Sequence, residues 1–198
     1  MISFINISNE EPYKVFKEKY DVAEKANQKI IEAVAIASYC KINDEVHSRF
    51  VNLKFIKNKE FVFFTNYESP KAKQFESHSQ ITALIYWNST NTQIRMKANI
   101  SKLPSRFSNE HFKSRTPNKN ALAISSMQST KTDSYESVLV EYDNVLKNAD
   151  LKKRPRYWGG YSFEPYYFEF WEGHQSRLNK RIVFEADDNE WNKYYLQP

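Results

Sequence analysis

Residues 158–181 read WGGYSFEPYYFEFWEGHQSRLNKR, and this stretch indicates the fold more clearly than any other part of the chain. Aromatic residues recur through it at the short intervals typical of β-strands. Its end places Arg177, Asn179 and Arg181 at alternate positions, which a continuous strand would direct to one face. Two guanidinium groups on one face repel each other unless an anion, or a carboxylate such as that of Glu169, lies between them. A bound phosphate and an internal ion pair explain these residues equally well.

The three glycines of the 198-residue chain, Gly159, Gly160 and Gly173, all lie in this stretch. The Rossmann fingerprint and the P-loop need several glycines at a strand-to-helix turn, so the sequence excludes both. Side chains must therefore hold the phosphate of any phosphorylated ligand. The formal charge is +5, but acidic residues are interspersed among the basic ones, which favours a solvated surface over a nucleic-acid interface.

The segments upstream indicate one domain, residues 1–198, that is mainly β with flanking helices (α+β). A helix is predicted over about 11–32, with Pro12 in its first turn and apolar residues at helical spacing as far as Ile30. Strands are predicted over 33–39, 49–56, 61–65, 81–87, 92–101 and within 158–196. Further helices are predicted from Ser69-Pro70, over 105–115 and 120–127, and after a capping box that begins at Asp133. Since few helices separate the strands, an antiparallel sheet is expected, and its aromatic content favours a barrel.

Motifs for hydrolytic and metal chemistry are missing from the sequence. There is no GxSxG or HExxH motif, the four histidines lack the spacing of metal ligands, and Cys40 is a lone cysteine. No resident metal ion is therefore predicted. The N-terminal residues lack the pattern of a signal peptide, and no run approaches the ~20 apolar residues of a membrane span, so a cytoplasmic protein is expected.

A series of motifs resembles the pyridoxamine 5′-phosphate oxidase family in order and approximate spacing. The C-terminal motifs are PRYWGGY at 155–161, FEFWEG at 168–173, Arg177-Leu178-x-x-Arg181, Glu190-Trp191 and the closing LQP at 196–198. The upstream motifs are RFVNLK at 49–54, FTN at 64–66, SPKA at 69–72, Gln93 and Gln128-Ser129. The resemblance covers residues 12–198. It implies an antiparallel FMN-binding split β-barrel that forms a homodimer, with FMN in clefts between the subunits and a dimerisation and substrate region over about 155–198.

The resemblance also implies which residues bind FMN. Arg49 and Lys71 would hold its phosphate, with Thr65 and Ser129 nearby. The other residues implied to contact the cofactor are Phe50, Val51, Asn52, Leu53, Lys54, Phe64, Gln93, Gln128, Trp171 and Arg181. Pro70 departs from the family pattern, because a basic residue is common at that position.

A second set of residues is implied to bind the substrate. This set is Lys54, His111, Arg115, Lys119, Arg177, Leu178 and Asn179, with Arg177 and Asn179 also serving catalysis. Lys54 and Arg115 would grip a substrate phosphate, and Arg177 would lie over the pyridine ring. Arg49 and Lys54 are five positions apart, so an ideal strand points them to opposite faces, which suits two phosphates in two sites.

Three of the implied substrate residues depart from the family pattern. His111, Lys119 and Asn179 stand where tyrosine, serine and histidine are usual. Asparagine can hydrogen-bond, but it cannot exchange a proton near neutral pH as histidine does.

The implied activity is that of an FMN-dependent oxidase of pyridoxamine 5′-phosphate or pyridoxine 5′-phosphate, in pyridoxine (vitamin B6) biosynthesis. In such an enzyme the flavin takes a hydride from the substrate, O2 reoxidises the flavin with release of hydrogen peroxide, and pyridoxal 5′-phosphate is the product. The departures leave two alternatives open. One is a related flavin oxidase that acts on another aromatic substrate, of phenazine type. The other is a non-catalytic protein that binds FMN or pyridoxal 5′-phosphate.

Overall fold

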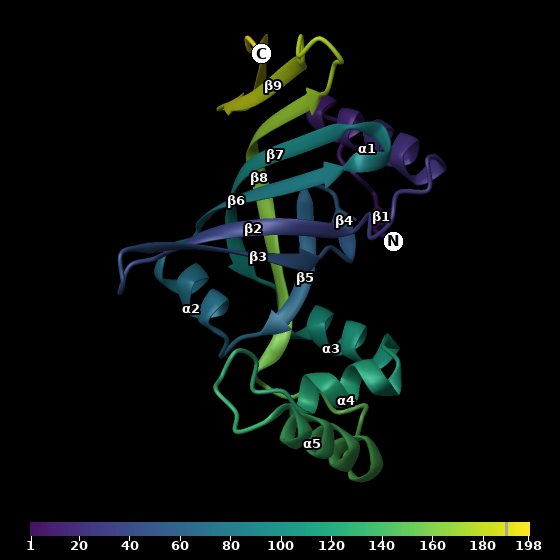
Figure 1. Ribbon diagram of the computed structural model, residues 1–198, viewed down its shortest axis with the longest axis vertical. Coiled ribbons are helices and arrows are strands. Elements are labelled where there is room, and N and C mark those ends of the chain that lie inside the picture. Colours follow the sequence, from purple (N-terminus) through teal and green to yellow (C-terminus); the bar gives the residue numbers. More distant parts are fainter. Residues whose placement is uncertain (189) are drawn as a thin grey trace.

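The computed structural model describes residues 1–188 and 190–198 and is a mixed α+β fold built on one ten-stranded sheet (Figure 1). The strands are β1 (Ser3–Ile5), β2 (Ala33–Cys40), β3 (Glu45–Asn52), β4 (Phe55–Lys57), β5 (Glu60–Asn66), β6 (Gln80–Trp87), β7 (Thr92–Lys102), β8 (Trp158–Glu172), β9 (Lys180–Asp187) and β10 (Glu190–Tyr195). The helices are α1 (Glu11–Lys25), α2 (Pro70–Ser77), α3 (Ser105–Ser114), α4 (Pro117–Ser125) and α5 (Tyr135–Asn148), with a 3₁₀ turn η1 (Asn88–Thr90). Within the described residues, no helix is long and apolar enough to cross a membrane.

The strand order is β1-β4-β5-β8-β7-β6-β2-β3, with β9 paired to β8 and β10 paired to β9. Except for β1 with β4, the pairs are antiparallel, which confirms the predicted sheet type. The 15-residue strand β8 pairs with β5 along its first part and with β9 along its last part. Figure 1 shows β8 running along the long axis of the molecule, from the end where α3, α4 and α5 gather to the end where β9 lies. It therefore links two distant regions of the fold.

An aromatic core joins α1 to the sheet. Tyr13 and Phe16 lie on one face of α1 and are fully buried. The Phe16 ring centroid is 5.1 Å from that of Phe61 and 5.9 Å from that of Trp87. Tyr13 packs edge-on against Phe168, with their centroids 5.2 Å apart. Truncating a buried aromatic side chain to alanine typically costs about 3–5 kcal/mol, so α1 is an integral part of the core.

The first helix is shorter than predicted, because it ends at Lys25 rather than near residue 32. Asn27 takes a left-handed conformation with φ 55°, and its N–H donates to the carbonyl of Glu24. The N–H of the next residue donates to the carbonyl of Ala23, which completes a Schellman-type helix end. Ile30, predicted to lie on the apolar face, has φ 51° and is 71% exposed. The apolar spacing continues in the sequence after the backbone has left the helix.

Two other helices begin at residues that the sequence pattern did not indicate. The N-cap of α5 is Ser134 and not Asp133, since the Ser134 hydroxyl accepts the hydrogen bond from a first-turn N–H. In the predicted apolar face of α5, Val145 is buried, whereas Leu139 is 47% exposed. α4 begins at Pro117 rather than near residue 120, because proline suits the first helical position.

Candidate functional site

A hollow of about 660 Å³ opens where the ends of β3 and β5 meet α2 and α3. Ten residues implied by the family resemblance line it: Phe50, Val51, Asn52, Lys54, Phe64, Thr65, Lys71, His111, Arg115 and Gln128. Trp158 completes the lining, and a second hollow of about 800 Å³ adjoins through shared residues that include Arg115 and Gln128. The described residues around the first hollow include three cations and no acid, so its potential favours an anion.

Lys71 in the lining of the hollow and Arg49 beside it form one cationic end of this site. Lys71, in the first turn of α2, donates from Nζ to Thr65 Oγ1 and to Ser69 Oγ, each at 3.2 Å. Arg49 on β3 donates from Nη1 to a serine hydroxyl of β2 at 2.6 Å and from Nη2 to Gln74 Oε1 at 2.8 Å. These partners are neutral, so they orient both cations without cancelling either charge.

Burial, together with the neighbouring charge of Arg49, lowers the pKa of Lys71 to about 8. Burial also lowers the pKa of Arg49. A buried cation that gains no carboxylate costs free energy in the folded state. An anionic ligand placed between Arg49 and Lys71 would remove that cost, and a phosphate suits both donors.

Lys54 and Arg115 form a second cationic end. Arg115 follows α3, and its guanidinium carbon lies 4.4 Å from the centroid of the Trp158 ring. Its Nη2 donates to the main-chain carbonyl of Lys119 at 2.8 Å, whereas its buried Nη1 has no hydrogen-bond partner among residues 1–188 and 190–198. Burial lowers the pKa of Arg115 to about 10. Burial and the charges of Lys119 and Arg115 lower the pKa of Lys54, against an opposing effect of Glu32.

His111 lies between the second cationic end and a column of aromatic rings. Its ring stacks on Phe64, with centroids 3.9 Å apart and planes inclined by 22°. Burial, and then the charges of Arg115 and Lys54, lower the pKa of His111 to about 4. His111 is therefore neutral at physiological pH, and its ring stacks on Phe64 without adding a positive charge to the hollow.

Gln128 lies in the segment after α4 and reaches the end of β5. Its Oε1 accepts a hydrogen bond from Thr65 Oγ1 at 2.9 Å, which links it to Lys71 through that hydroxyl. Its neighbour Ser129 is exposed and has φ 68°, and Lys119 is also exposed. Leu53 is fully buried in the hydrophobic core, so its side chain does not face the hollow.

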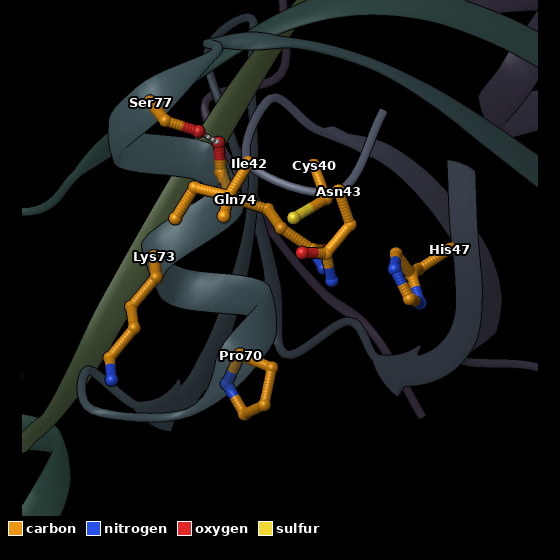
Figure 2. A pocket seen from close by; sticks show the side chains of 8 residues that line it. All are labelled: Cys40, Ile42, Asn43, His47, Pro70, Lys73, Gln74 and Ser77. Atoms are coloured by element: carbon orange, nitrogen blue, oxygen red, sulfur yellow. Dashed lines mark hydrogen bonds between the residues drawn. The ribbon is translucent and has the colours of Figure 1, made fainter. Parts of the chain in front are cut away.

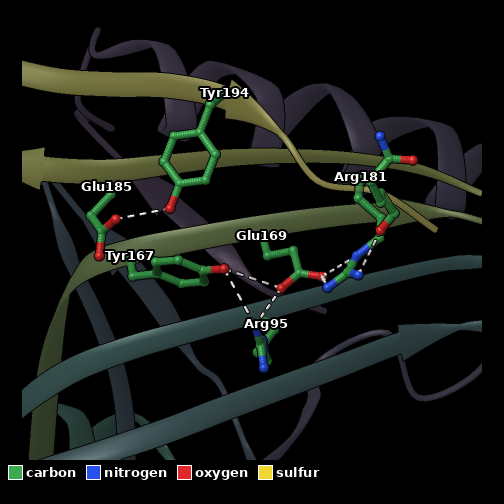
Figure 3. A network of polar contacts seen from close by, with 7 residues as sticks. Arg95, Tyr167, Glu169, Arg181, Glu185 and Tyr194 are labelled. Carbon is green, nitrogen blue, oxygen red and sulfur yellow. Dashed lines mark hydrogen bonds and ion pairs between the residues drawn. The ribbon is translucent and has the colours of Figure 1, made fainter.

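The remaining implied residues lie at the other end of β8. Gln93, Trp171 and Arg181 are register partners across β7, β8 and β9, so they form one row across the sheet. Arg181 donates from Nε and Nη2 to Glu169 Oε1 at 2.9 and 2.7 Å (Figure 3). The internal ion pair that the sequence left open is therefore present at Arg181.

The prediction that Arg177, Asn179 and Arg181 share a strand face is wrong. β9 begins at Lys180, so Arg177 and Asn179 lie in the loop between β8 and β9. Arg177 has φ 59°, and its N–H donates to the carbonyl of His174. Asn179 Oδ1 accepts the His174 N–H at 3.0 Å, which closes the loop. Alternation predicts a face only where the backbone stays extended. Leu178, in the same loop, is 69% exposed.

One copy of the chain does not bring the two groups of residues together. Trp158 lines the hollow at the start of β8, and Trp171 belongs to the row near its end. The two tryptophans are thirteen positions apart along the strand, which corresponds to on the order of 40 Å along β8. Figure 1 shows the same separation, with α3 and β9 at opposite ends of the molecule. The residues implied to bind the cofactor therefore fall into two groups at opposite ends of β8.

No motif or periodic pattern in the sequence indicated Gln74 and Ser38, the two residues that hold Arg49 in place. Gln74 holds Arg49 on one side and lines a separate hollow of about 580 Å³ on the other, between α2 and the β2–β3 hairpin (Figure 2). Ser38 also bonds Arg49. Gln74 stands three positions after Lys71 on a predicted helix, and this shared helix face was the one available clue.

Comparisons with known proteins identify the family. Residues 158–198 match the model of the pyridoxine 5′-phosphate oxidase C-terminal dimerisation region. The chain is 31% identical to the pyridoxine/pyridoxamine 5′-phosphate oxidase of Colwellia psychrerythraea, with 96% of this chain and 88% of that protein covered. The chain belongs to the pyridoxamine 5′-phosphate oxidase family. The enzyme of the same name from Leptospira interrogans is 30% identical, with 98% of this chain and 92% of that protein covered.

Solved structures from this oxidase family and its relatives have the same fold. The crystal structure of PhzG from Burkholderia lata, in complex with tetrahydrophenazine-1-carboxylic acid, is 26% identical and has a TM-score of 0.90 over 95% of this chain and 93% of that chain. A pyridoxamine 5′-phosphate oxidase-related, FMN binding protein from Nostoc punctiforme has a TM-score of 0.79 at 14% identity, over 95% of this chain and 98% of that chain. The predicted split-barrel fold is confirmed.

Proposed function

We propose that this protein is an FMN-dependent oxidase that converts pyridoxamine 5′-phosphate and pyridoxine 5′-phosphate to pyridoxal 5′-phosphate, with O2 consumed and hydrogen peroxide released. With the amine substrate, water is also consumed and ammonia is released. The observation that carries the proposal is the presence of two separate cationic groups at one hollow whose described lining has no acid: Lys71, with Arg49 beside it, and Lys54 with Arg115. Two anion sites suit a phosphorylated cofactor beside a phosphorylated substrate. The names of the relatives support the same activity.

In this proposal Arg49 and Lys71 bind the FMN phosphate, helped by the hydroxyl of Thr65. The orphaned charge of Lys71 and its neutral partners fit an anion better than they fit an unliganded core. When bound, FMN supplies the two-electron chemistry between substrate and O2. Phe50, Phe64 and Gln128 border the same hollow and would position the rest of the cofactor.

The second part of the cofactor site comes from another copy of the chain. Gln93, Trp171 and Arg181 form one row, but that row lies at the far end of β8 from the hollow. A homodimer in which the row of one copy faces the hollow of its partner would complete two equal sites. The match of residues 158–198 to a dimerisation region supports this arrangement. In this proposal each copy of the chain is a single domain, residues 1–198.

Lys54 and Arg115 bind the substrate phosphate in this proposal, and the exposed Lys119 adds a third positive charge nearby. His111 is neutral and offers a ring nitrogen without changing the charge of the site. Arg177, Leu178 and Asn179 reach the substrate ring from the loop of the partner copy. The chain thus orients the substrate from both ends, and this orientation lowers the entropic part of the barrier.

A second candidate activity is oxidation of a phenazine-type aromatic acid. Its support is the similarity to PhzG, at 26% identity and a TM-score of 0.90, together with the departures at His111, Lys119 and Asn179. The two activities differ in the anionic group of the substrate, a phosphate in one and a carboxylate in the other.

The test is a substrate panel on the purified protein saturated with FMN. We expect FMN to be released on denaturation, and anaerobic bleaching of the flavin by both vitamin B6 phosphates. Formation of pyridoxal 5′-phosphate and peroxide after admission of O2 completes the assay. Bleaching by a dihydrophenazine carboxylic acid alone would favour the second candidate, and a protein that binds FMN but is bleached by neither class would contradict both.

FMN affinity is expected to fall as the pH rises above about 8. The phosphate binds protonated Lys71, whose pKa is lowered to about 8 by burial, so in the free protein this lysine loses its proton at a pH where an ordinary lysine keeps it. Fluorescence titration between about pH 7 and 10 measures the effect, with riboflavin as the control that lacks a phosphate. A parallel fall for both flavins would assign the pH dependence to another group.

Asn179→Ala is expected to raise the KM for pyridoxamine 5′-phosphate about fivefold to tenfold and to leave FMN affinity unchanged. Asn179 Oδ1 accepts the His174 N–H and so holds the loop that carries Arg177. A lost hydrogen bond of about 1 kcal/mol accounts for a change of this size. Asn179→His supplies another acceptor and is expected to restore the KM. A gain of about 10²-fold in kcat for Asn179→His would instead show that this position limits proton transfer.

A further inference from the structure

Glu169 is a buried carboxylate that contacts two arginines at once (Figure 3). Its side chain is 3% exposed. Oε1 accepts from Nε and Nη2 of Arg181, and Oε2 accepts from Arg95 Nη2 and from the Tyr167 hydroxyl. Despite burial, the hydrogen bond from Arg181 and the charge of Arg95 hold the pKa of Glu169 below its ordinary value. The carboxylate is therefore ionised at neutral pH and satisfied on both oxygens.

Arg181 is held from a second direction by the C-terminal segment. Its Nη1 donates to the main-chain carbonyl of Gln197 at 2.9 Å, and its own carbonyl accepts the N–H of Leu196 at 3.1 Å. All three nitrogens of the guanidinium thus have a partner, and 26% of the side chain is exposed. Because a guanidinium has five N–H groups, two remain for a ligand.

Sheet register places this carboxylate next to the proposed flavin row. Glu169 lies two positions before Trp171 on β8, so both side chains point to the same face. Trp171 is opposite Arg181 on one side and Gln93 on the other, while Glu169 is opposite Arg95. The bonds from Glu169 therefore reach Arg181 diagonally, along the face on which the row lies.

An arginine that must find its geometry on binding loses side-chain entropy at that moment, on the order of 0.5–1.5 kcal/mol. Arg181 has already lost it, because Glu169 and the Gln197 carbonyl fix the guanidinium in the folded chain. An ion pair that served the sheet alone would change stability without changing ligand affinity. An ion pair that prepares Arg181 for a ligand would change both the stability of the protein and its affinity for the ligand.

We propose that Glu169 is a positioning residue that, together with the main-chain carbonyl of Gln197, holds the Arg181 guanidinium ready for the flavin. The proposal rests on the proposed function, in which Arg181 contacts FMN. It assigns to Glu169 no contact with the cofactor, because its two oxygens are already occupied by the two arginines and a tyrosine. It also gives the last residues of the chain a part in the site.

The test is a double-mutant cycle on FMN affinity, measured by flavin fluorescence on the full-length dimer. Arg181→Ala and Glu169→Gln are each expected to weaken FMN binding about tenfold, and the double variant is expected to bind no more weakly than Arg181→Ala. Glu169→Asp keeps the charge and is expected to recover part of the loss. The visible spectrum of bound FMN is expected to shift in the same direction in both single variants.

Two further variants keep the outcome interpretable. Glu172→Gln is the matched control, since Glu172 is on the same strand but pairs with Lys19 and Lys180, and FMN affinity should stay at the wild-type value. Arg181→Lys keeps the cation but cannot make the two-nitrogen contact with Glu169, so it is expected to lose almost as much FMN affinity as Arg181→Ala. Because this variant keeps the buried carboxylate of Glu169, it tests the proposal even if Glu169→Gln does not fold.

The outcomes separate this inference from the proposed function. The positioning role alone would be overturned if the losses of FMN affinity in the cycle were independent and multiplied in the double variant. It would also be overturned if Glu169→Gln or Arg181→Lys kept wild-type affinity while Arg181→Ala bound FMN more weakly. Wild-type affinity for Arg181→Ala, or no FMN binding by the wild-type protein, would overturn the cofactor site on which the inference rests.

Discussion

Lys71→Met is expected to weaken FMN binding by about 10²-fold or more and, at the same time, to stabilise the protein without FMN. Lys71 is 8% exposed and has hydroxyl partners, Thr65 and Ser69. Losing a charged donor to a phosphate in a desolvated site costs about 2–5 kcal/mol of binding free energy. The lowered pKa of Lys71 means that its protonated form destabilises the folded apoprotein at neutral pH.

The stabilising half of this prediction comes from replacing a buried, unpaired charge by an apolar side chain of similar length. A gain of about 1 kcal/mol would raise the melting temperature of a chain of this size by about 2–4 °C. Lys73→Met is the matched control, because Lys73 is exposed on the same helix and should change neither quantity. Calorimetry of the apoprotein and flavin titration provide the two measurements. Loss of stability together with loss of binding would mean that Lys71 is a structural cation.

Arg115→Met is expected to reduce kcat/KM for pyridoxamine 5′-phosphate by about 10²–10³-fold, with FMN affinity within about threefold of wild type. Arg115 lies over Trp158 and keeps Nη1 without a partner among the described residues, so it is poised to donate to an incoming anion. Arg115→Lys is expected to restore little, because an ammonium neither stacks on the ring nor offers a planar fork.

The choice of substrates sharpens this second prediction. Unphosphorylated pyridoxamine should react equally slowly with wild type and Arg115→Met, so that the preference for the phosphate collapses in the variant. Lys113→Met is the control, since Lys113 is exposed on the same helix, α3. An equal loss of FMN affinity would mean that both cationic ends serve the cofactor, and an unchanged kcat/KM would place the substrate phosphate elsewhere.

Strand faces were predictable from the sequence because alternation is a local property. Alternation over the predicted strand 92–101 places Gln93, Arg95 and Lys97 on one face and Ile94 and Met96 on the other. In the structure the first three are half-buried and the other two are fully buried. The same rule failed after β8, where the left-handed backbone of a non-glycine residue breaks the extended geometry that the rule assumes. The left-handed position is Arg177 and not Gly173 at the start of the loop, so residue type did not mark where the extended backbone would end.

The set of residues that form the candidate site was harder to predict from the sequence, because these residues come together only when the strands and helices pack against one another. Lys71, with Arg49 beside it, and Gln128 reach the same hollow from distant parts of the chain, and the family resemblance, not periodicity, brought them together. Ser38 and Gln74 were missed for the same reason, whereas Glu169 was named as a possible carboxylate partner from the same stretch of sequence as Arg181. A polar residue on a strand or helix has no assigned partner until the neighbouring elements are placed.

The length of β8 has a consequence for inheritance. Each chain places Trp158 at one end of this strand and Trp171 at the other, so in the proposed dimer each chain lends a different end to each of two sites. Consider one allele with a substitution at Lys71 and another with a substitution at Arg181, each of which gives an inactive protein when expressed alone. Co-expression of the two alleles is expected to restore activity. Their mixed dimer assembles one sound site from the two undamaged ends and collects both lesions in the other. Two alleles with substitutions at the same end of β8 are not expected to restore activity when co-expressed. Complementation tests would therefore sort mutations into two groups, one for each end of this strand.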